Sequence, residues 1–482
     1  MNVDILKKLV ELFQKNQFEK VLETAAPIID QNPSDIDLLN IFGSAAAITG
    51  QFQLAESVLK RALTVDATHA ELNNNLGNVL FRQAKYAESI KHFEQAIKSQ
   101  PENSNFYNGL GTALLLMDRI KDSERVFKTS LNLQPKNPDT HYNIGAVFWE
   151  KGCTKDAQNC CLTALSLNPR HEKAKVMMIR TFESHNPDEK IDFPTVVANR
   201  KIRKINLGED INKRMEEDNI TKILDSADGI LTNFDSAINY PETQSYRRDQ
   251  TRLNCNRHER IFNEHNIIPK FCFACFKVQV EPRTIFELIK LFLLFDWIDL
   301  SANNTRKCMV ELRDKIPGFY KGLIYCSSLN EAKSIFSTIS THVSELIDPE
   351  VPCSIKRGCS EFAQAYPDYG NIEKNGAFDL MDYRNEWQAI ENNFDAYHKS
   401  DRPLNGAPTI KGLSLSDFLI IKNWIGYARG IGDPSISGLS LKQIGSDRVL
   451  EAAAKRKGKL LSTTQLKVAS YADYNTKPIN LI

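Results

Sequence analysis

Residues 70–103 read AELNNNLGNVLFRQAKYAESIKHFEQAIKSQPEN and show one unit of a repeating pattern. Its glycine belongs to a series with a step of 34 residues: Gly43, Gly77, Gly111 and Gly145. A proline keeps the same step, with Ala67 standing in once: Pro33, Pro101, Pro135 and Pro169. A small residue where two helices cross, followed by a proline that ends the second helix, indicates a stacked helical repeat.

In phase, the repeat units run over residues 2–35, 36–69, 70–103, 104–137 and 138–171. In residues 70–103, Asn75-Leu76-Gly77-Asn78 precedes Tyr86, Phe93, Ala96 and Pro101, and this pattern resembles the tetratricopeptide repeat (TPR) family. The resemblance implies an α-solenoid of TPR helix pairs. We expect residues 172–184 to form a closing helix that shields the last apolar face.

Some positions depart from the family pattern. Ser89, Ser123 and Ser130 stand where helix contacts favour alanine. The first unit has Leu9 in place of the glycine, which is typical of an atypical terminal repeat.

The first helices of such units line one concave surface, which binds extended peptides or partner helices in many members of the family. Asparagines precede the motif leucine, at Asn40, Asn74, Asn75, Asn108 and Asn143. Because an asparagine amide offers a donor and an acceptor to a peptide backbone, we predict that these residues bind a peptide. They resemble the asparagine ladder of protein O-GlcNAc transferase repeats, except that Ile41 and Gly109 occupy the rung that Asn75 and Asn143 fill. The alternative is an ordinary solvated helix face.

Charge and hydropathy do not favour a nucleic-acid or membrane partner. The 482 residues carry a net charge of +1, which gives no electrostatic argument for nucleic acid or membrane as the main partner. The most apolar stretch, residues 285–298, is shorter than the ~20 residues of a spanning helix. The N-terminal residues show no signal-peptide pattern, so we expect a cytoplasmic protein whose ten cysteines are thiols or metal ligands.

Four regions are predicted: a TPR array with its closing helix (1–185), a linker and helix (186–240), an α+β domain (241–372) and a mostly helical region with a basic tail that we expect to be disordered (373–482). Within the second region, the charged residues 186–205 indicate a linker or a solvated helix, and 211–227 a helix. In the last region, helices are expected at 388–398 and 415–427, with the glycines of 426–432 as a helix stop.

The α+β domain shows short β-rich runs between helical ones. Strands are expected at 271–280, 307–312, 319–326 and within 353–362, and helices at 285–298 and 330–347. This β-α-β-β-α-β order predicts a ferredoxin-like fold, which serves many functions.

Cysteine and histidine form the clearest chemical pattern. Cys255 and His258 are three residues apart, as are Cys272 and Cys275, and two such pairs can close a tetrahedral zinc site. Zinc is therefore a candidate cofactor. Against this, a strand over 271–280 would direct Cys272 and Cys275 to opposite faces. Core packing of the thiols and a redox or iron–sulfur site are the alternatives.

Two further patterns suggest binding. Lys321-Gly322-Leu323-Ile324-Tyr325 resembles the third strand of an RNA recognition motif, although Leu323 stands where an aromatic belongs. Five arginines form a basic stretch suited to phosphate or carboxylate, or to pairing with Asp249, Glu259 and Glu264: Arg247, Arg248, Arg252, Arg257 and Arg260.

Three functions remain open from the sequence. The first is an interaction scaffold that binds a peptide or partner protein on the TPR surface, with a C-terminal effector domain. The second is a protein-modifying enzyme, such as a glycosyltransferase or another group transferase, that recruits its substrate through the array. The third is a metal- or RNA-binding regulatory protein. Phosphate-loop and esterase motifs are absent from the sequence, so no reaction is predicted.

Overall fold

A computed structural model describes most of the chain: residues 3–208, 210–234, 238–247, 253–300, 302, 304–314, 316–372, 380–398, 400–401, 403, 407–439 and 446–465. The chain divides into two compact units. The first contains Met1–Met178 and Asn392–Gly406, and the second contains Ile179–Glu391 and Ala407–Ile482. In the described residues, no helix is long and apolar enough to cross a membrane.

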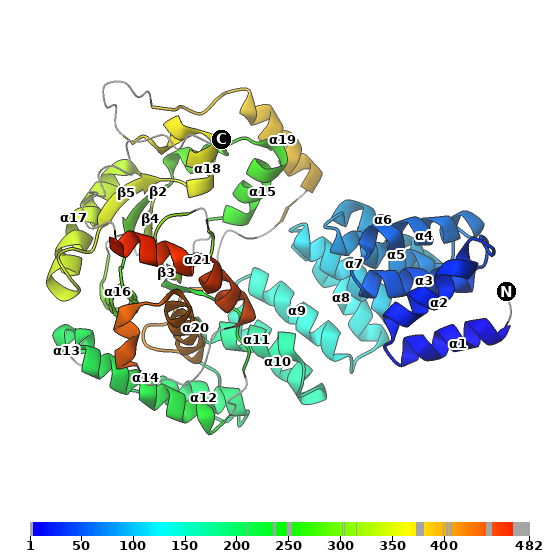
Figure 1. Cartoon of the computed structure of the whole chain (residues 1–482), viewed down its shortest axis with the longest axis horizontal. Helices are drawn as coiled ribbons and strands as arrows, with labels where there is room; N and C mark the ends of the chain where they lie inside the picture. Colours follow the sequence, from blue (N-terminus) through cyan, green and yellow to red (C-terminus); the bar gives the residue numbers. More distant parts are fainter. Residues whose placement is uncertain are drawn as a thin grey trace. The chain divides into compact units, whose positions relative to one another are not determined.

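The first unit contains a solenoid of helix pairs, drawn from blue to cyan in Figure 1. Its helices are α1 (Val3–Gln14), α2 (Phe18–Ile29), α3 (Ile36–Ile48), α4 (Phe52–Val65), α5 (Ala70–Arg82), α6 (Tyr86–Ser99), α7 (Ser104–Leu116), α8 (Ile120–Leu133), α9 (Pro138–Glu150) and α10 (Thr154–Leu167). Each helix contacts the next one along the chain. The helical repeat predicted from the sequence is therefore confirmed.

The repeated glycines let the two helices of a pair cross closely. A Cβ atom on Gly111 would lie 2.6 Å from the ring of Phe127, and one on Gly77 would lie 2.8 Å from the ring of Phe93. Real Cβ atoms do not approach other atoms so closely, so the large aromatic partner requires glycine here.

The first pair solves the same packing problem with the sizes exchanged. Leu9 holds the glycine position and Ala25 holds the position of Phe93 and Phe127, and both Leu9 and Ala25 are fully buried in one apolar cluster. In this pair the large side chain lies on the first helix, α1, and the small one on the second helix, α2.

The buried serines connect the helices of a pair through hydrogen bonds. Ser89 Oγ donates to the carbonyl oxygen of Gly77 (2.8 Å), and Ser123 Oγ donates to that of Gly111 (2.7 Å). A buried hydroxyl is costly unless it finds such an acceptor. These serines therefore add polar contacts at positions where the family pattern has only apolar packing.

Helix α11 (Glu172–Thr181) follows the array where a closing helix was predicted. Its Ala174 and Met178 are fully buried, as expected of a helix that covers an apolar face. The boundary between the two compact units falls inside this helix, after Met178. The four-region division expected from the sequence stays a prediction.

The second unit is built on one antiparallel sheet with the strand order β1-β3-β4-β2-β5. Its strands are β1 (Gln244–Arg247), β2 (Phe276–Val280), β3 (Arg306–Val310), β4 (Tyr320–Cys326) and β5 (Cys353–Arg357). From β2 to β5 the elements follow the order strand, helix, strand, strand, helix, strand. The sequence did not predict β1.

The longer helices of this unit are α12 (Pro194–Ile202), α14 (Glu217–Thr232), α15 (Cys255–His265), α16 (Ile285–Trp297), α17 (Leu329–Leu346), α19 (Trp387–His398, whose last residues belong to the first unit), α20 (Leu415–Ile431) and α21 (Asp447–Gln465). Its shorter helices are α13 (Ile211–Met215), α18 (Ser360–Ala365) and the 3-10 helices η1 (Lys270–Ala274), η2 (Pro367–Gly370) and η3 (Pro434–Gly438). One face of the sheet is apolar: the backbone of Gly322 lies against Leu291 and Phe295 of α16.

Helix α20 lies in the core of this unit, with Trp424 and Tyr427 fully buried. Its Asp417 forms a buried ion pair with Arg247 of β1, which also pairs with Asp296 of α16 (2.5 Å). Burial raises the pKa of the Asp417 carboxyl, but Arg247 and its hydrogen bonds bring that pKa below its usual range. The described part of the predicted basic stretch thus includes a structural arginine that pairs with neither Glu259 nor Glu264.

Several predicted elements need correction. The strand expected from residue 271 begins only at Phe276, because residues 270–274 form η1. The helix expected at 211–227 is broken at Glu216, whose backbone is extended, into α13 and α14. The helix expected to stop at 427 continues to Ile431, and Gly432, with φ of 85°, ends it.

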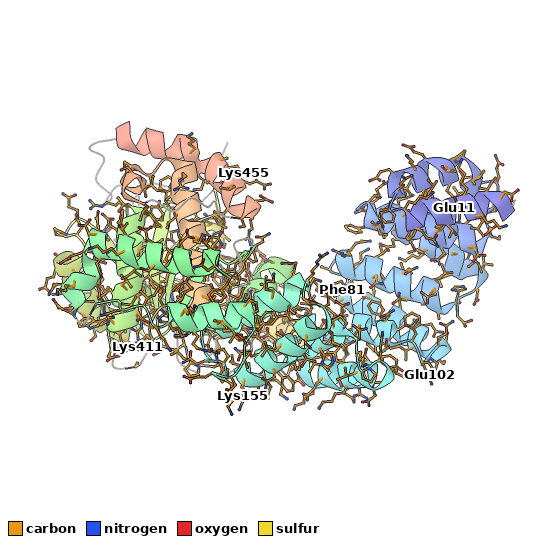
Figure 2. All side chains as sticks on the ribbon, turned by 90° about the horizontal axis from the view of Figure 1, so that it is seen from below. Glu11, Phe81, Glu102, Lys155, Lys411 and Lys455 are labelled. Carbon is orange, nitrogen blue, oxygen red and sulfur yellow. The ribbon has the colours of Figure 1, made fainter. Side chains whose placement is uncertain are left out.

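Two charged segments are less solvated than the sequence indicated. Residues 194–202 form α12, whose Val196, Ala198 and Ile202 are fully buried. The basic tail begins as α21, and its Arg456 is buried and donates to carbonyl oxygens that include those of Glu311 and Gly318. Figure 2 labels Lys455 on this helix. Residues 466–482 of the tail lie outside the described residues.

Candidate protein-interaction surface

One stripe along the first helices stays partly or fully accessible. Positions i, i+3 and i+7 share a helix face, and this face holds residues 41, 44 and 48 of α3 and their equivalents 34, 68 and 102 residues later. None of these residues is buried: Ile41, Ser44, Ile48, Asn75, Asn78, Arg82, Gly109, Thr112, Leu116, Asn143, Ala146 and Glu150. We call this stripe the first-helix surface.

Large apolar side chains are exposed on the first-helix surface. Ile48 is 53% exposed and Leu116, at the equivalent position two repeats later, is 44% exposed. Arg82 and Glu150 hold the same position in the other two repeats. Phe81, which is half-buried and labelled in Figure 2, borders the stripe at the end of α5. The surface therefore alternates apolar and charged side chains from one repeat to the next.

Two of the predicted asparagines join neighbouring repeats. Asn75 Nδ2 donates to Asn40 Oδ1 (2.8 Å) and to Ser44 Oγ (3.2 Å). Asn74 makes a long contact of 3.5 Å with Asn75. The Asn40 and Asn75 amides thus lie side by side on half-buried positions, and each keeps unused hydrogen-bonding capacity.

Asn108 is used inside the array. Its Oδ1 accepts hydrogen bonds from Ser130 Oγ (3.2 Å) and Thr140 Oγ1 (3.0 Å), two side chains that are fully buried. This network holds α7, α8 and α9 together. Asn143 differs, because it is half-buried and its amide makes no hydrogen bond within the described residues.

The missing rung at Gly109 has a packing cause. A Cβ atom there would lie 2.5 Å from the ring of Phe93, which is the same ring that requires Gly77. An asparagine at 109 would therefore clash with the core, and the ladder is interrupted because Phe93 fills this space.

The array also holds a segment from near the end of the chain. The Asp401 carboxylate accepts hydrogen bonds from the backbone N–H groups of Ile120 and Lys121 at the start of α8, and Asp401 N donates to Asp118 O (2.9 Å). Helix α8 has no side-chain cap of its own. Asp401 therefore caps α8 from 281 residues away, which sequence patterns cannot show.

The cysteine and histidine pairs do not form a ligand set. Among the described residues, no three His, Cys, Asp or Glu side chains are placed to hold a metal ion. His258, on α15 with Cys255, is buried and stacks on Phe271 at 5.0 Å. Cys272 is buried in η1, where burial raises the pKa of its thiol well above its usual range, and burial raises that of Cys275 to about 11. The described side chains therefore give no support to the zinc site, which stays a prediction.

The RNA-like strand is also explained differently. Lys321 is buried and its ammonium group pairs with Glu311 at 2.9 Å, and Leu323 is 7% exposed. Of the arginine stretch, Arg257 pairs with Glu391 and Arg260 lies 4.0 Å from Glu264, while Arg248 and Arg252 lie outside the described residues.

The exposed side chains of Ile48 and Leu116 were not predicted from the sequence, although their 68-residue separation within one register could have identified them.

Comparison with known proteins supports the array and nothing beyond it. A family model described as TPR repeat matches residues 77–118. A search of curated protein sequences finds no match to the chain.

Solved structures resemble the N-terminal third. YrrB, described as a TPR protein with an unusual peptide-binding site, has 16% identity and a TM-score of 0.31, covering 36% of this chain and 90% of YrrB. The pilF protein of Pseudomonas aeruginosa has 19% identity and a TM-score of 0.34, covering 37% and 81%. MamA has 19% identity and a TM-score of 0.31, covering 36% and 98%. The family model and the helix pairs described above make the N-terminal segment a TPR array, and TPR repeats indicate a protein–protein interaction scaffold.

Proposed function

We propose that the first-helix surface binds an extended peptide segment of a partner protein. The amides of Asn40, Asn75 and Asn143 would hydrogen-bond to the peptide backbone, and Ile48 and Leu116 would contact apolar side chains of the peptide. Asn108 is left out, because buried partners already use its carbonyl oxygen.

The observation that carries this proposal is the pair of exposed apolar side chains at one repeat position, Ile48 and Leu116. A large apolar side chain that is half exposed in a regular register gains free energy when a partner covers it, at about 25 cal/mol per Å². Arg82 lies between these two positions in the register and favours a carboxylate in the peptide. An extended peptide with an acidic side chain between two apolar ones fits Ile48, Arg82 and Leu116.

A displayed library of random peptides, selected against the full-length protein, tests the proposal. Selected peptides are titrated into the wild type and into the double variant Ile48→Ser, Leu116→Ser by fluorescence anisotropy. Each side chain contributes about 1–2 kcal/mol when covered, so we expect the double variant to bind at least about tenfold more weakly.

The matched control is Val65→Ser on α4. Val65 is 47% exposed, as much as Ile48 or Leu116, but it belongs to a second helix. We expect this variant to bind like the wild type. Failure to select any peptide, or equal affinity for the double variant, would contradict the proposal.

The second unit supports a finer assignment of fold. We infer a ferredoxin-like unit from β2, α16, β3, β4, α17 and β5, supported by their antiparallel strand order with β2 and β4 in the centre. Strand β1 extends it at the edge beside β3. We also infer a cytoplasmic location, which rests on the sequence expectation alone.

A further inference from the structure

Three lysines point from one face of the sheet. Lys277 of β2 lies directly opposite Lys356 of β5 on one side and Tyr325 of β4 on the other, and directly paired residues share a face. Lys307 of β3 pairs with Leu323, two residues from Tyr325, so it lies on this face as well. We call Lys277, Lys307 and Lys356 the lysine face. It is opposite to the apolar face that α16 covers.

This arrangement is unfavourable for the protein alone. Like charges directly opposite each other destabilise a sheet, and Lys277 is only 5% exposed. In the described residues, no carboxylate lies within ion-pair distance of the three ammonium groups. The neighbouring Glu311 is already paired with Lys321 and Arg313.

Two other buried cations of this unit have carboxylate or carbonyl partners. Arg247 has two carboxylates, and Arg456 donates to backbone carbonyl oxygens. On the lysine face the contacts are weaker: Lys277 Nζ lies 3.4 Å from Cys359 Sγ, and Lys307 Nζ lies 5.8 Å from the centre of the Tyr246 ring. The lysine face therefore carries positive charge that the described residues do not neutralise.

Hydrogen bonds connect the residues around these lysines. Lys356 Nζ donates to Ser360 Oγ (2.8 Å). Between these two residues, Gly358 N donates to Cys275 O (2.8 Å), which holds the turn in place. Tyr369 fills the space beside Gly358, whose φ is 51°, and donates to Cys272 O (2.7 Å). Ser360 and Cys359 are thus held beside the lysines, where a hydroxyl and a thiol can add hydrogen bonds to a bound group.

We propose that the lysine face is a binding site for a small tetrahedral oxyanion, a phosphate or sulfate group that is either free or part of a small molecule. Lys277, Lys307 and Lys356 supply the charge, and Ser360 donates a hydrogen bond. Such a ligand would neutralise the repulsion between Lys277 and Lys356. Burial lowers the pKa of Lys356 to about 8, with repulsion from Lys277 as a further cause. For Lys277 itself burial is outweighed by the nearby thiols of Cys359, Cys275 and Cys255, which raise its pKa.

Isothermal titration calorimetry of the full-length protein with inorganic phosphate and with inorganic sulfate, at constant ionic strength set by chloride, tests this site. We expect binding of at least one of the two by the wild type. The double variant Lys277→Met, Lys356→Met should bind at least about tenfold more weakly, since two charge-assisted hydrogen bonds are lost. It should still fold, because methionine removes two like charges and fills a similar volume.

Lys290→Met is the matched control, since Lys290 of α16 is 15% exposed and paired with Glu217. It should bind the anion like the wild type. The proposal is overturned if neither anion binds beyond the chloride background, if the double variant binds equally well, or if only a single-stranded RNA oligonucleotide binds, which would make the face a nucleic-acid surface. None of these results depends on the peptide site of the array.

Discussion

At the scale of single residues, the crossing of each helix pair depends on how much space the partner side chain leaves. Gly111 faces the ring of Phe127, whereas Gly145 faces Cys160 and Cys161, and a Cβ atom at 145 would lie no closer than 3.2 Å. Gly111→Ala should therefore destabilise the array by about 1–3 kcal/mol through overpacking, and Gly145→Ala by less. Urea unfolding followed by circular dichroism measures both.

Gly229→Ala is the control for this comparison. Gly229 lies inside α14 with no atom within 4 Å of the position of a Cβ, so alanine should stabilise the helix by about 0.5–1 kcal/mol. If Gly111→Ala and Gly145→Ala lower the free energy of unfolding equally, the aromatic ring of Phe127 does not determine the destabilisation.

The lysine face predicts how stability changes with pH. Burial, together with repulsion from Lys277, lowers the pKa of Lys307 and of Lys356 to about 8, from a usual 10.5. Between these pH values the unfolded chain holds protons that the folded protein has lost, so the free energy of unfolding should rise with pH. Other charged or titratable groups near these lysines also contribute: Lys321, Arg313, Glu361, Cys255 and Cys359.

The measurement is the difference in free energy of unfolding between the wild type and Lys307→Met, Lys356→Met across this pH window. We expect the free energy of unfolding of the wild type to rise relative to that of the variant as the pH increases above about 8. A difference in the free energy of unfolding that does not change with pH would contradict the lowered pKa values of Lys307 and Lys356. Binding of phosphate should change in the opposite direction, since the lysines bind an anion only when protonated.

The glycine period was visible in the sequence because the same close helix crossing, which leaves no room for a larger residue, recurs every 34 residues. The roles of Ser89 and Ser123 were not visible. Their hydroxyls donate to carbonyl groups on the partner helix, and such acceptors depend on how two helices cross. Likewise, Phe93 excludes a side chain at Gly109, which the sequence showed only as a departure from the ladder.

At the scale of elements, α8 depends on a cap from a distant segment. Asp401→Ala should destabilise the first unit by about 0.5–2 kcal/mol, because two N–H groups at the start of α8 lose a charged acceptor. Thermal unfolding of the full-length protein checks this. Asp30→Ala is the control: Asp30 is 87% exposed and lies 3.6 Å from Arg61, so its loss should cost almost nothing. Equal effects of the two variants would argue against the cap.

Elements with strong periodicity were predicted well, and those that depend on tertiary contacts were not. Helices α16 and α17 lie where apolar spacing placed them. A strand was expected to begin at residue 271, because Phe271 and Phe273 favour β structure. Instead Phe273 packs against Tyr369 and Tyr383, and this aromatic cluster favours the 3-10 turn of η1.

At the scale of the whole molecule, the two units differ in how far their sequence reveals a site. The array repeats its surface, so residues 34 apart in sequence are equivalent in space. Asn75 and Asn143, which are 68 residues apart, and Asn40, one position before this register, could therefore be proposed from sequence. The lysine face brings together β2, β3 and β5, which span residues 276–357 and whose register no local pattern encodes. The zinc site stays a prediction, since no set of three possible ligands is found among the described side chains.

The most direct test of the interaction surface is the place where a bound peptide lies. A peptide selected on the full-length protein is synthesised with a photoreactive benzophenone side chain and crosslinked, and the attachment sites are mapped by mass spectrometry. Crosslinks to α3, α5, α7 and α9, at or beside Ile48 and Leu116, are the predicted result. Crosslinks to the second helices α4, α6, α8 and α10, or to the second unit, would contradict the account.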